Sequence, residues 1–369
     1  MRIIVDCQPL AYNCIYSSFS NFIITCHHYI IQKNAEIEWQ FVVDSRYVDN
    51  HFINAIPSAH IIIKKVWANK AGWKLWYDYQ LPLLLKKNKA NLLITTGGII
   101  SSANIPQCVW ITGLRDKTEG YYNLYKKRIK KTTRDSIGIF TVSDSDKMEI
   151  IRQNSTESKK VTVIKPFPEA GIKPFSWAEK ESTKTKFAAG LEYFLAVVGE
   201  QSDNLVDLLK AFSQFKKRLQ SNMQFVIAGQ GLRNAIYFAE KLESFKYRSD
   251  VHVYYNPSEN ELMQLIPASY ALILPDKTES GASILHAFQA EVPVVIPESS
   301  RLYEITAGAG LYIDLGNTES LANQLILLYN DEKRRSKLIE NGKRQSLLFT
   351  KEKAINDLYE VILQVAENV

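Results

Sequence analysis

Glycine is scarce in this sequence. Its 16 glycines among 369 residues amount to about 4%, against an average of about 7% in globular proteins. Loops that cradle phosphate groups normally rely on glycine, because their backbone must approach the ligand closely. The shortage therefore bears on any loop of this chain that would bind a phosphate group.

Long apolar runs are also missing. No segment approaches the roughly 18 to 20 consecutive apolar residues that a membrane-spanning helix needs. At the N-terminus, Asp6 interrupts the apolar run that begins at Ile3, so this segment does not resemble a signal peptide. We therefore expect a cytoplasmic protein.

Cysteines are few, and they form no CxxC pair and no spacing typical of a metal site. Buried or unreactive thiols are favoured over disulfides and zinc ligands. The adjacent His27 and His28 lack an obvious partner, so we assign no metal to them. The cysteines all lie in the first third of the chain: Cys7, Cys14, Cys26 and Cys108.

The rest of the composition is that of a packed globular protein. Hydrophobic residues make up 46% of the chain and charged residues 23%, which excludes a disordered or low-complexity protein. The length predicts two or three domains. The net charge of +6 favours anionic ligands or a negatively charged surface, but it is too diffuse to indicate nucleic acid.

Short apolar runs alternate with longer amphipathic segments in the first half of the chain. Runs that are apolar at nearly every position indicate parallel strands that are covered on both faces. The segments between them, such as 19–32 and 73–87, are long enough for crossover helices. The predicted strands cover residues 3–7, 41–43, 61–66, 92–95, 108–111, 139–142 and 161–164.

The alternation stops between Lys165 and Lys186 and then restarts. This interruption contains Pro166, Pro168 and Pro174 and ends in a charged run, which is typical of a linker between domains. The strands predicted after it cover residues 193–198, 224–228, 251–255, 271–274, 293–296 and 311–313.

The pattern predicts an α/β protein of two Rossmann-like, doubly wound domains. We expect an N-terminal domain at 1–170, a linker at 171–190 and a C-terminal domain at 191–345. A helical segment at 346–369 is able to pack back on the N-terminal domain. Ligands of such sheets bind at the carboxyl ends of the strands, which predicts an active site in a cleft between the two domains.

The stretch 271–297 combines a strand, a loop of small residues, a helix and a second strand. The backbone N–H groups of Gly281, Ala282 and Ser283 at the start of this helix are placed to bind a phosphate group with the help of the helix dipole. Glu279 precedes them, where its carboxylate can accept hydrogen bonds from sugar hydroxyls. The alternative is that Ser283 only caps the helix and that Glu279 is a solvated loop acid.

The second half also holds a specific succession of short motifs. These are Phe194-Leu-Ala-Val-Val-Gly199, Asn204-Leu205, Leu209-Lys-Ala-Phe212, Phe225-Val-Ile-Ala-Gly-Gln-Gly231, Glu261-Leu262, Ala268-Ser-Tyr-Ala-Leu-Ile-Leu-Pro275 and Pro293-Val-Val295. The succession resembles the GT-B fold glycosyltransferases of family 4 (group 1), which are retaining, metal-independent enzymes that use nucleotide-diphosphate sugars. The N-terminal half is similar more loosely, through residues 1–4, 81–82, 109–111, 139–143 and 161–163.

The resemblance implies a donor site with a pair of glutamates, of which Glu279 matches the first and lies near the transferred sugar. The second glutamate binds the nucleotide ribose in the family, and His286 takes its position here. A neutral imidazole has one accepting nitrogen, so we expect weaker nucleotide binding or an altered geometry. The other residues that the resemblance places on the donor side include Gly199, Gly231, Tyr255 and Ser280.

A second departure concerns the diphosphate. The family places an Arg and a Lys after the first C-terminal strand to neutralise the leaving group, whereas this chain has Glu200 and Asp203 at or near those positions. Two unit charges about 4 Å apart interact by roughly 4 kcal/mol at an effective dielectric constant of about 20, so replacing attraction with repulsion is a large change. The sequence therefore predicts a degenerate donor site, with no cofactor and no metal.

The N-terminal loops also depart from the family. The family carries a glycine-rich loop after its first strand, but residues 13–20 contain no glycine. The His-Asp pair expected after the strand at 109–111 is absent as well, and Asp116 is the candidate substitute as a catalytic residue. The resemblance places Ser18, Thr112 and Gly113 on the acceptor side.

Two helical patterns have alternative interpretations. Trp73, Trp76 and Tyr77 share one helix face, which favours core packing over sugar stacking. A basic helix at 121–134 is able to contact anionic lipid head groups, and the alternative is a solvated face. Its cations are Lys126, Lys127, Arg128, Lys130, Lys131 and Arg134.

The sequence favours a hexosyltransferase-type enzyme that moves a sugar, with retention, from a nucleotide-diphosphate donor to a glycan or lipid-linked acceptor. We expect it in the cytoplasm or at the inner face of the membrane, with no nucleic-acid partner. The alternative is a catalytically inactive GT-B-like protein that binds glycans or modulates a partner enzyme. The motivation for this alternative is the set Glu200, Asp203 and His286.

Overall fold

The computed structural model divides the chain into two compact units. The first unit comprises Met1–Pro166 and Lys351–Val369, and the second comprises Phe167–Thr350. The structure describes residues 1–12, 18–31, 33, 36–45, 60–67, 69–112, 119–168, 171–199, 205–229, 235–276 and 281–367.

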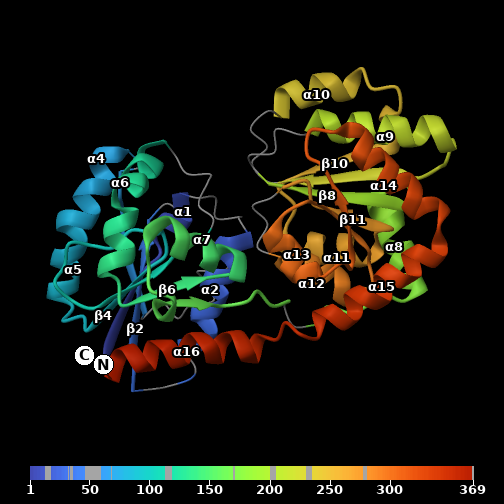
Figure 1. The fold of residues 1–369 in the computed structure, drawn as a ribbon. Coiled ribbons are helices and arrows are strands. Elements are labelled where there is room, and N and C mark those ends of the chain that lie inside the picture. Colours follow the sequence, from blue (N-terminus) through green and yellow to red (C-terminus); the bar gives the residue numbers. More distant parts are fainter. Residues whose placement is uncertain are drawn as a thin grey trace. The chain divides into compact units, whose positions relative to one another are not determined.

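The first unit is built on a parallel sheet whose described strands run in the order β3-β2-β1-β4-β5-β6-β7 (Figure 1). The order reverses between β1 and β4, which makes the carboxyl ends of these two strands the switch point of the sheet. The parallel sheet predicted from the apolar runs is confirmed. The strands are β1 (Arg2–Asp6), β2 (Glu38–Asp44), β3 (Ile61–Lys64), β4 (Leu92–Thr95), β5 (Gln107–Trp110), β6 (Gly138–Thr141) and β7 (Val161–Val163).

Helices cover both faces of this sheet, which explains why its strands are apolar at nearly every position. The helix predicted at 73–87 consists of three consecutive helical pieces, of which the middle one, η2, is a π-helix. The helices of the first unit are α1 (Gln8–Tyr12), α2 (Ser18–Ile31), α4 (Lys70–Leu75), η2 (Trp76–Gln80), α5 (Leu81–Lys87), α6 (Glu119–Asp135), α7 (Asp144–Asn154), the short 3-10 helix η3 (Ser158–Lys160) and α16 (Lys351–Glu367).

The core of the first unit has two sides. On one side Ile4 and Leu93 pack against Trp73, Trp76 and other residues of α4, η2, α5 and α6. On the other side the buried imidazole of His27, from α2, lies against the rings of Phe41 and Trp110. Trp73, Trp76 and Tyr77 are all buried, so core packing is the correct interpretation of that aromatic stripe.

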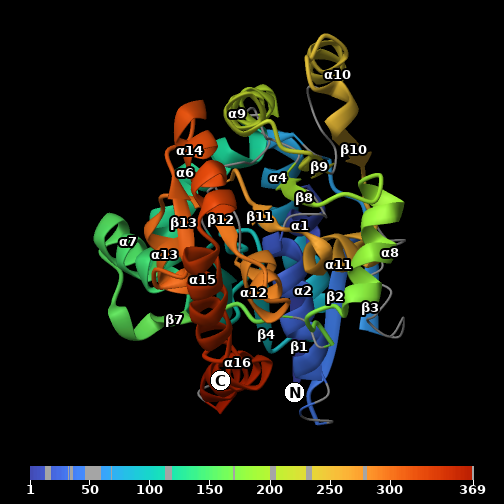
Figure 2. The ribbon, with the colours of Figure 1, turned by 90° about the vertical axis from the view of Figure 1, so that its right-hand side faces the viewer.

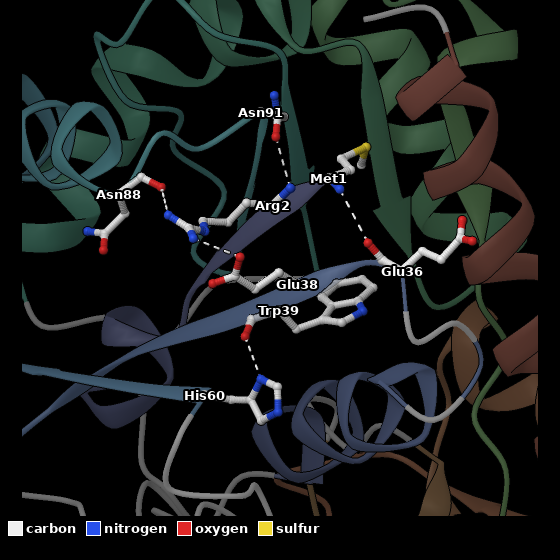
Figure 3. A network of polar contacts seen from close by, with 8 residues as sticks. All are labelled: Met1, Arg2, Glu36, Glu38, Trp39, His60, Asn88 and Asn91. Atoms are coloured by element: carbon white, nitrogen blue, oxygen red, sulfur yellow. Dashed lines mark hydrogen bonds and ion pairs between the residues drawn. The ribbon is translucent and has the colours of Figure 1, made fainter.

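A polar network fastens the amino ends of β1, β2 and β4 (Figure 3). The Arg2 side chain pairs with Glu38 at 2.7 Å and donates to the carbonyl oxygen of Asn88. The Arg2 backbone N–H donates to Asn91 Oδ1 at 2.8 Å. At the same edge, His60 Nδ1 lies 2.7 Å from the carbonyl oxygen of Trp39. Because ligands bind parallel sheets at the opposite, carboxyl edge, we interpret this network as structural.

The second unit repeats the architecture, with described strands in the order β10-β9-β8-β11-β12-β13. Its switch point lies between β8 and β11. The strands are β8 (Tyr193–Val198), β9 (Gln224–Gly229), β10 (Val251–Tyr255), β11 (Ala271–Ile273), β12 (Val294–Pro297) and β13 (Gly310–Ile313). The helices are α8 (Trp177–Phe187), α9 (Leu205–Leu219), α10 (Ala235–Glu243), the short 3-10 helix η4 (Arg248–Asp250), α11 (Glu259–Ala268), α12 (Ala282–Gln289), α13 (Ser300–Thr306), α14 (Thr318–Asn330) and α15 (Glu332–Ser346).

Helices α12 and α15 lie side by side at close range (Figure 2). A Cβ atom added at Gly342 of α15 would lie 2.9 Å from Cε1 of Phe288, which belongs to α12. Real Cβ atoms essentially never approach a neighbour that closely, so α15 needs glycine at this position. The packing fixes α12, whose N-terminus faces the switch point of the sheet.

The segment predicted as a linker, 171–190, differs from the prediction. Most of it forms α8, which belongs to the second unit and packs on α11. Ser176 and Glu179 begin this helix with a reciprocal pair of capping hydrogen bonds. Its charged side chains suggested a solvated segment, but Phe187 at its end is buried in the core of the second unit.

The C-terminal helix α16 belongs to the first unit, although it follows the whole of the second unit in the sequence. It contacts α2, β6 and β7. Its buried face consists of Ala354, Ile355, Leu358 and Ile362. The apolar residues whose spacing predicted the helix therefore lie on the face that packs on the first sheet and on α2.

Candidate functional site

The switch point of the second sheet brings the ends of two strands together. Gly199 directly follows β8, and Asp276 follows β11 after two residues. A Cβ atom added at Gly199 would lie 3.4 Å from Oδ2 of Asp276. Because Gly199 has no side chain, none separates the backbone after β8 from the carboxylate of Asp276.

The start of α12 lies at the same edge of the sheet, where the chain returns after β11. Gly281 caps this helix with a φ of 98°, a left-handed conformation that glycine adopts without strain. Ala282 and Ser283 form the first turn and are half-buried. Backbone N–H groups of a first helical turn attract anions, because the helix dipole places partial positive charge there.

His286 lies one turn further along α12 and is half-buried. Burial lowers the pKa of its imidazole from 6.5 to about 4, because removing water disfavours the charged form. The side chain is therefore neutral at physiological pH. It offers one accepting and one donating nitrogen, as expected from the sequence.

Two more side chains lie at the carboxyl edge of this sheet. Tyr255 ends β10 and is 49% exposed, so its ring offers a surface on which a planar group can stack. Arg301 lies in the first turn of α13, which follows β12, and it is half-buried. Arg301 lies four residues after the end of β12. Among the described residues within four positions of a strand's carboxyl end in this sheet, it is the one with a positive charge.

Several residues implied by the resemblance lie outside the described residues. They are Glu200, Asp203, Gly231, Glu279 and Ser280 in the second unit, and Gly113 and Asp116 in the first.

The switch point of the first sheet holds a buried carboxyl group, Asp6, at the end of β1. Trp76 Nε1 donates to its Oδ2 at 3.2 Å, and the backbone N–H of Gln8 donates to its Oδ1 at 3.2 Å. The Tyr77 hydroxyl group also hydrogen-bonds it. Burial nevertheless dominates and raises the pKa of Asp6 from 3.8 to about 7.

A chain of hydroxyl groups extends from Asp6 to the end of β4. The hydroxyl oxygens of Tyr77 and Tyr121 are 3.0 Å apart, and the Tyr121 hydroxyl donates to the carbonyl oxygen of Gly97 at 2.8 Å. A side chain at Gly97 would collide with Tyr121 and Pro9. The network therefore ties β1, β4, η2 and α6 together at the edge where this sheet would bind a ligand.

The two described residues predicted on the acceptor side lie on this unit. Thr112 is buried and follows β5 after one residue, so it lies at the carboxyl edge. Ser18 begins α2.

Sequence reasoning missed Asp6, Asp276 and Arg301. Asp6 is the last residue of an otherwise apolar strand, and Asp276 comes three residues after one. A charged residue at the end of a buried strand is the signal that would have pointed to both, because such residues meet at one edge of a parallel sheet. Arg301 follows β12 in the same way.

The basic helix predicted at 121–134 forms most of α6. The predicted membrane-contact surface is wrong in including Arg128. This side chain pairs with Asp78 of η2 at 2.8 Å and is half-buried. The other cations named for this helix are exposed: Lys126, Lys127, Lys130, Lys131 and Arg134.

The three cysteines that the structure describes, Cys7, Cys26 and Cys108, are free and buried. Burial raises the pKa of the Cys108 thiol to about 12, so it carries no thiolate at neutral pH. The prediction of buried thiols without disulfides is confirmed for these three, and Cys14 lies outside the described residues. In the described part of the chain, no helix is long and apolar enough to cross a membrane.

Solved structures that contain two such units show the fold. Sucrose-phosphate synthase from Thermosynechococcus elongatus superimposes with a TM-score of 0.79 over 100% of both chains, at 12% identity. HepE from Anabaena, in complex with UDP and glucose, gives a TM-score of 0.75 over 99% of this chain and 100% of its own, at 13% identity. The fold is the GT-B fold of glycosyltransferases, as the sequence predicted.

The sequence comparisons show a similarity to one family of glycosyltransferases. Residues 179–345 match the family "Glycosyl transferases group 1", and the switch point of the second sheet and α12 lie within them. O-antigen chain mannosyltransferase B from Escherichia coli is 23% identical over 216 residues, or 58% of this chain, and the alignment spans 56% of that enzyme's length. Residues 179–345 are therefore similar to the group 1 glycosyltransferases, and the similarity to the Escherichia coli enzyme extends over little more than half of either protein.

Proposed function

We propose that this protein is a retaining glycosyltransferase that moves a hexose from a nucleotide-diphosphate donor to a glycan or lipid-linked acceptor. The observation that carries the proposal is the start of α12, where Gly281 adopts its left-handed conformation at the switch point of the second sheet. This first turn lies inside the region that matches the family. HepE, which has the same fold, was solved with UDP-glucose.

In the proposed reaction, the backbone N–H groups of Gly281, Ala282 and Ser283 hold the diphosphate of the donor. Preorganised donors of this kind stabilise the negative charge that develops on the leaving group, which is usually the largest catalytic contribution. Arg301 supplies a cation at the same edge, where the family's own cations are missing. We propose that this arrangement works without a metal ion or another cofactor.

The other roles follow the resemblance. Glu279 orients the transferred sugar, and Tyr255 and His286 contact the nucleoside. Retention requires that the acceptor attacks the sugar on the same face from which the diphosphate leaves. This places the acceptor hydroxyl group beside the leaving group, and a phosphate oxygen of the leaving group takes its proton. Asp116, Ser18 and other residues of the first unit contribute the acceptor side.

A second candidate function is a catalytically inactive protein that binds glycans or modulates a partner enzyme. Two observations favour it. The carboxylate of Asp276 lies beside Gly199, close to where a diphosphate approaches, and like charges repel. In addition, His286 is neutral where the family uses a second glutamate.

Calorimetric titration with UDP, GDP and ADP tests the donor site. We expect one of them to bind with a Kd of about 1 μM. Replacing Ser283 with proline keeps a conformation that the first helical turn tolerates and removes one N–H donor, so Ser283→Pro should weaken binding about tenfold. The matched control is Lys333→Pro, at the same position in the first turn of α15, which should leave the Kd unchanged.

Two further outcomes complete this experiment. Arg301→Met should weaken binding of the diphosphate about tenfold but should affect the nucleoside monophosphate much less, because the cation is proposed to act on the phosphates. If the folded wild-type protein binds none of the three nucleotides, or if it binds but neither transfers nor hydrolyses any nucleotide sugar, the transferase proposal is wrong and the second candidate replaces it.

We also propose a peripheral membrane contact through α6. Its five exposed cations, Lys126, Lys127, Lys130, Lys131 and Arg134, lie on the side of the helix that faces away from the core. Basic residues near a bilayer are attracted by anionic lipids. Such a contact would bring the protein to a lipid-linked acceptor.

A further inference from the structure

Strand β3, the outermost described strand on one side of the first sheet, leads into an exposed tryptophan. Trp67 comes three residues after the end of β3 and is 67% exposed. Lys64 and Lys65, which precede it, are exposed as well. Because parallel sheets bind their ligands at the carboxyl ends of their strands, Trp67 lies at the edge of the first sheet where a ligand is expected.

Hydrogen bonds hold the backbone that carries this indole. The carbonyl oxygen of Lys64 accepts from the backbone N–H of Ser45 at 2.9 Å and from Nε2 of Gln8 at 3.2 Å. The backbone N–H of Val66 donates to Oδ2 of Asp44 at 3.3 Å. The Val66 side chain is 2% exposed and packs in the core of the first unit. The exposed ring is therefore attached to a segment whose position is fixed.

The start of α4 supports Trp67 from a second side. A Cβ atom added at Gly72 would lie 2.6 Å from Cβ of Trp67, so the two segments approach this closely only because residue 72 is glycine. Asn69 caps the helix, and its Oδ1 accepts from the backbone N–H of Gly72 at 2.8 Å. A ring supported in this way is ordered before a ligand arrives, which lowers the entropic cost of binding.

Positive charge lies beside the indole. Lys65 and Trp67 are exposed, whereas Val66 between them is buried. Because side chains of an extended segment alternate between two sides, Lys65 and Trp67 point to the same side. Residues 60–77 of the sequence contain no aspartate or glutamate. The surroundings of Trp67 therefore favour a ligand that carries negative charge.

We propose that Trp67, Lys64 and Lys65 form an acceptor subsite for an acidic saccharide, one that carries a carboxylate or a phosphate group. The C–H groups on one face of the sugar ring pack on the indole, and the lysines bind the anion. The inference rests on the proposed transferase function, whose acceptor it assigns to the anionic glycans. Since β3 lies two strands from β1, or about 10 Å at the usual strand spacing, the subsite holds a sugar residue away from the reacting hydroxyl group.

The combination of an indole and cations selects this class of ligand. A neutral glycan would use the indole and leave the lysines without a partner in the complex. An inorganic anion would use the lysines but would not cover the ring. An acidic saccharide uses both, because it combines an apolar ring face with a negative charge.

Two matched pairs of trisaccharides test the subsite by calorimetry on the whole protein, in the absence of any nucleotide sugar. One pair is trigalacturonic acid and its neutral methyl ester. The other is mannotriose with and without a phosphate group on its terminal residue. We expect at least one acidic trisaccharide to bind about tenfold more tightly than its neutral partner, because hydrogen bonds to charged groups are stronger. The pair that shows the difference identifies the anion as carboxylate or phosphate.

Variants separate the contribution of charge from that of the ring. Lys65→Met should lower the affinity for the acidic trisaccharide to that of its neutral partner and leave the neutral one unchanged. Trp67→Ala should weaken both about tenfold, because contact with the ring does not depend on charge, and Trp67→Phe should restore most of the loss. Trp177→Ala and Lys333→Met, at exposed positions of the second unit, are the matched controls and should change neither affinity.

Three results would overturn the subsite. The folded wild-type protein would bind neither acidic trisaccharide more tightly than its neutral partner, or Trp67→Ala would leave both affinities unchanged. In the third, Trp67→Ala would weaken the binding of UDP, which would mean that the indole stacks on a nucleotide base instead of a sugar.

These results are distinguishable from a failure of the transferase proposal, because trisaccharide binding is measured without a donor. If the wild-type protein binds an acidic trisaccharide through Trp67 but neither transfers nor hydrolyses any nucleotide sugar, the transferase proposal is wrong and the subsite stands as a glycan-binding site. If it hydrolyses a nucleotide sugar but shows no preference for the acidic trisaccharides, the subsite is wrong and the transferase proposal stands.

Discussion

The surroundings of Asp6 change the pKa of its carboxyl group. It accepts hydrogen bonds from Trp76 Nε1 and from the backbone of Gln8, which lower its pKa, yet burial outweighs them and the pKa rises to about 7. Between pH 4 and 7 the folded protein therefore retains a proton that the unfolded chain has released. By linkage, stability falls as the pH rises through this interval.

We expect Asp6→Asn to remove this pH dependence. A pKa that is raised by about three units corresponds to a loss of up to about 4 kcal/mol between low and high pH. Urea unfolding at pH 5 and at pH 8 measures it, and the wild-type protein should lose more stability between them than the variant does. The control is Asp135→Asn, because ion pairing with Arg134 lowers the pKa of Asp135 and it does not titrate in this range. Equal losses in wild type and Asp6→Asn would contradict the prediction.

At the scale of elements, α12 matters most, because it carries both the proposed phosphate site and His286. The helix is short, from Ala282 to Gln289, so its position depends on packing more than on its own stability. Its buried side chains Ile284, Leu285 and Phe288 pack in the core of the second unit. On its other side it meets α15 at Gly342.

Gly342→Ala should therefore be destabilising, although alanine favours helix. The new methyl group would overlap the ring of Phe288, and overpacking of this kind costs about 1 to 3 kcal/mol, more than the roughly 1 kcal/mol that alanine contributes in a helix. Ser336→Ala, at an exposed position of the same helix, should be neutral or slightly stabilising. Denaturant unfolding measures both, and a stabilised Gly342→Ala protein would show that α12 and α15 are not in close contact.

At the scale of the whole molecule, the chain is not folded in simple sequence order. The last helix, α16, returns to the first unit and packs on α2, β6 and β7. Leu358 at its centre is fully buried. The first unit is thus completed only when the end of the chain is present.

Two matched variants test this arrangement. Leu358 of α16 and Leu325 of α14 are both fully buried leucines in helices, and replacing either with alanine should cost about 2 to 5 kcal/mol. In hydrogen exchange, Leu358→Ala should weaken protection in β6 and β7 of the first unit, and Leu325→Ala should weaken protection in β13 of the second. Loss of protection confined to the second unit in Leu358→Ala would place α16 there instead.

The sequence alone determined the strands, the two parallel sheets and the burial of Trp73, Trp76 and Tyr77. These features depend on the local spacing of apolar residues, which is visible in a single sequence. It also located the start of α12 and the substitution at His286, because both lie in short motifs. The placement of the anion site by those motifs remains a prediction until a ligand is bound.

Only the tertiary structure decided which distant residues meet. Asp276 lies beside Gly199, and Asp6 is held by Trp76, because the parallel sheets bring together the ends of strands that are far apart in the chain. The charged pattern of α8 suggested a linker, and the packing of Phe187 made it part of the second unit. Local periodicity specifies which face of an element is buried, but it does not specify the surface that covers this face, since that depends on long-range contacts.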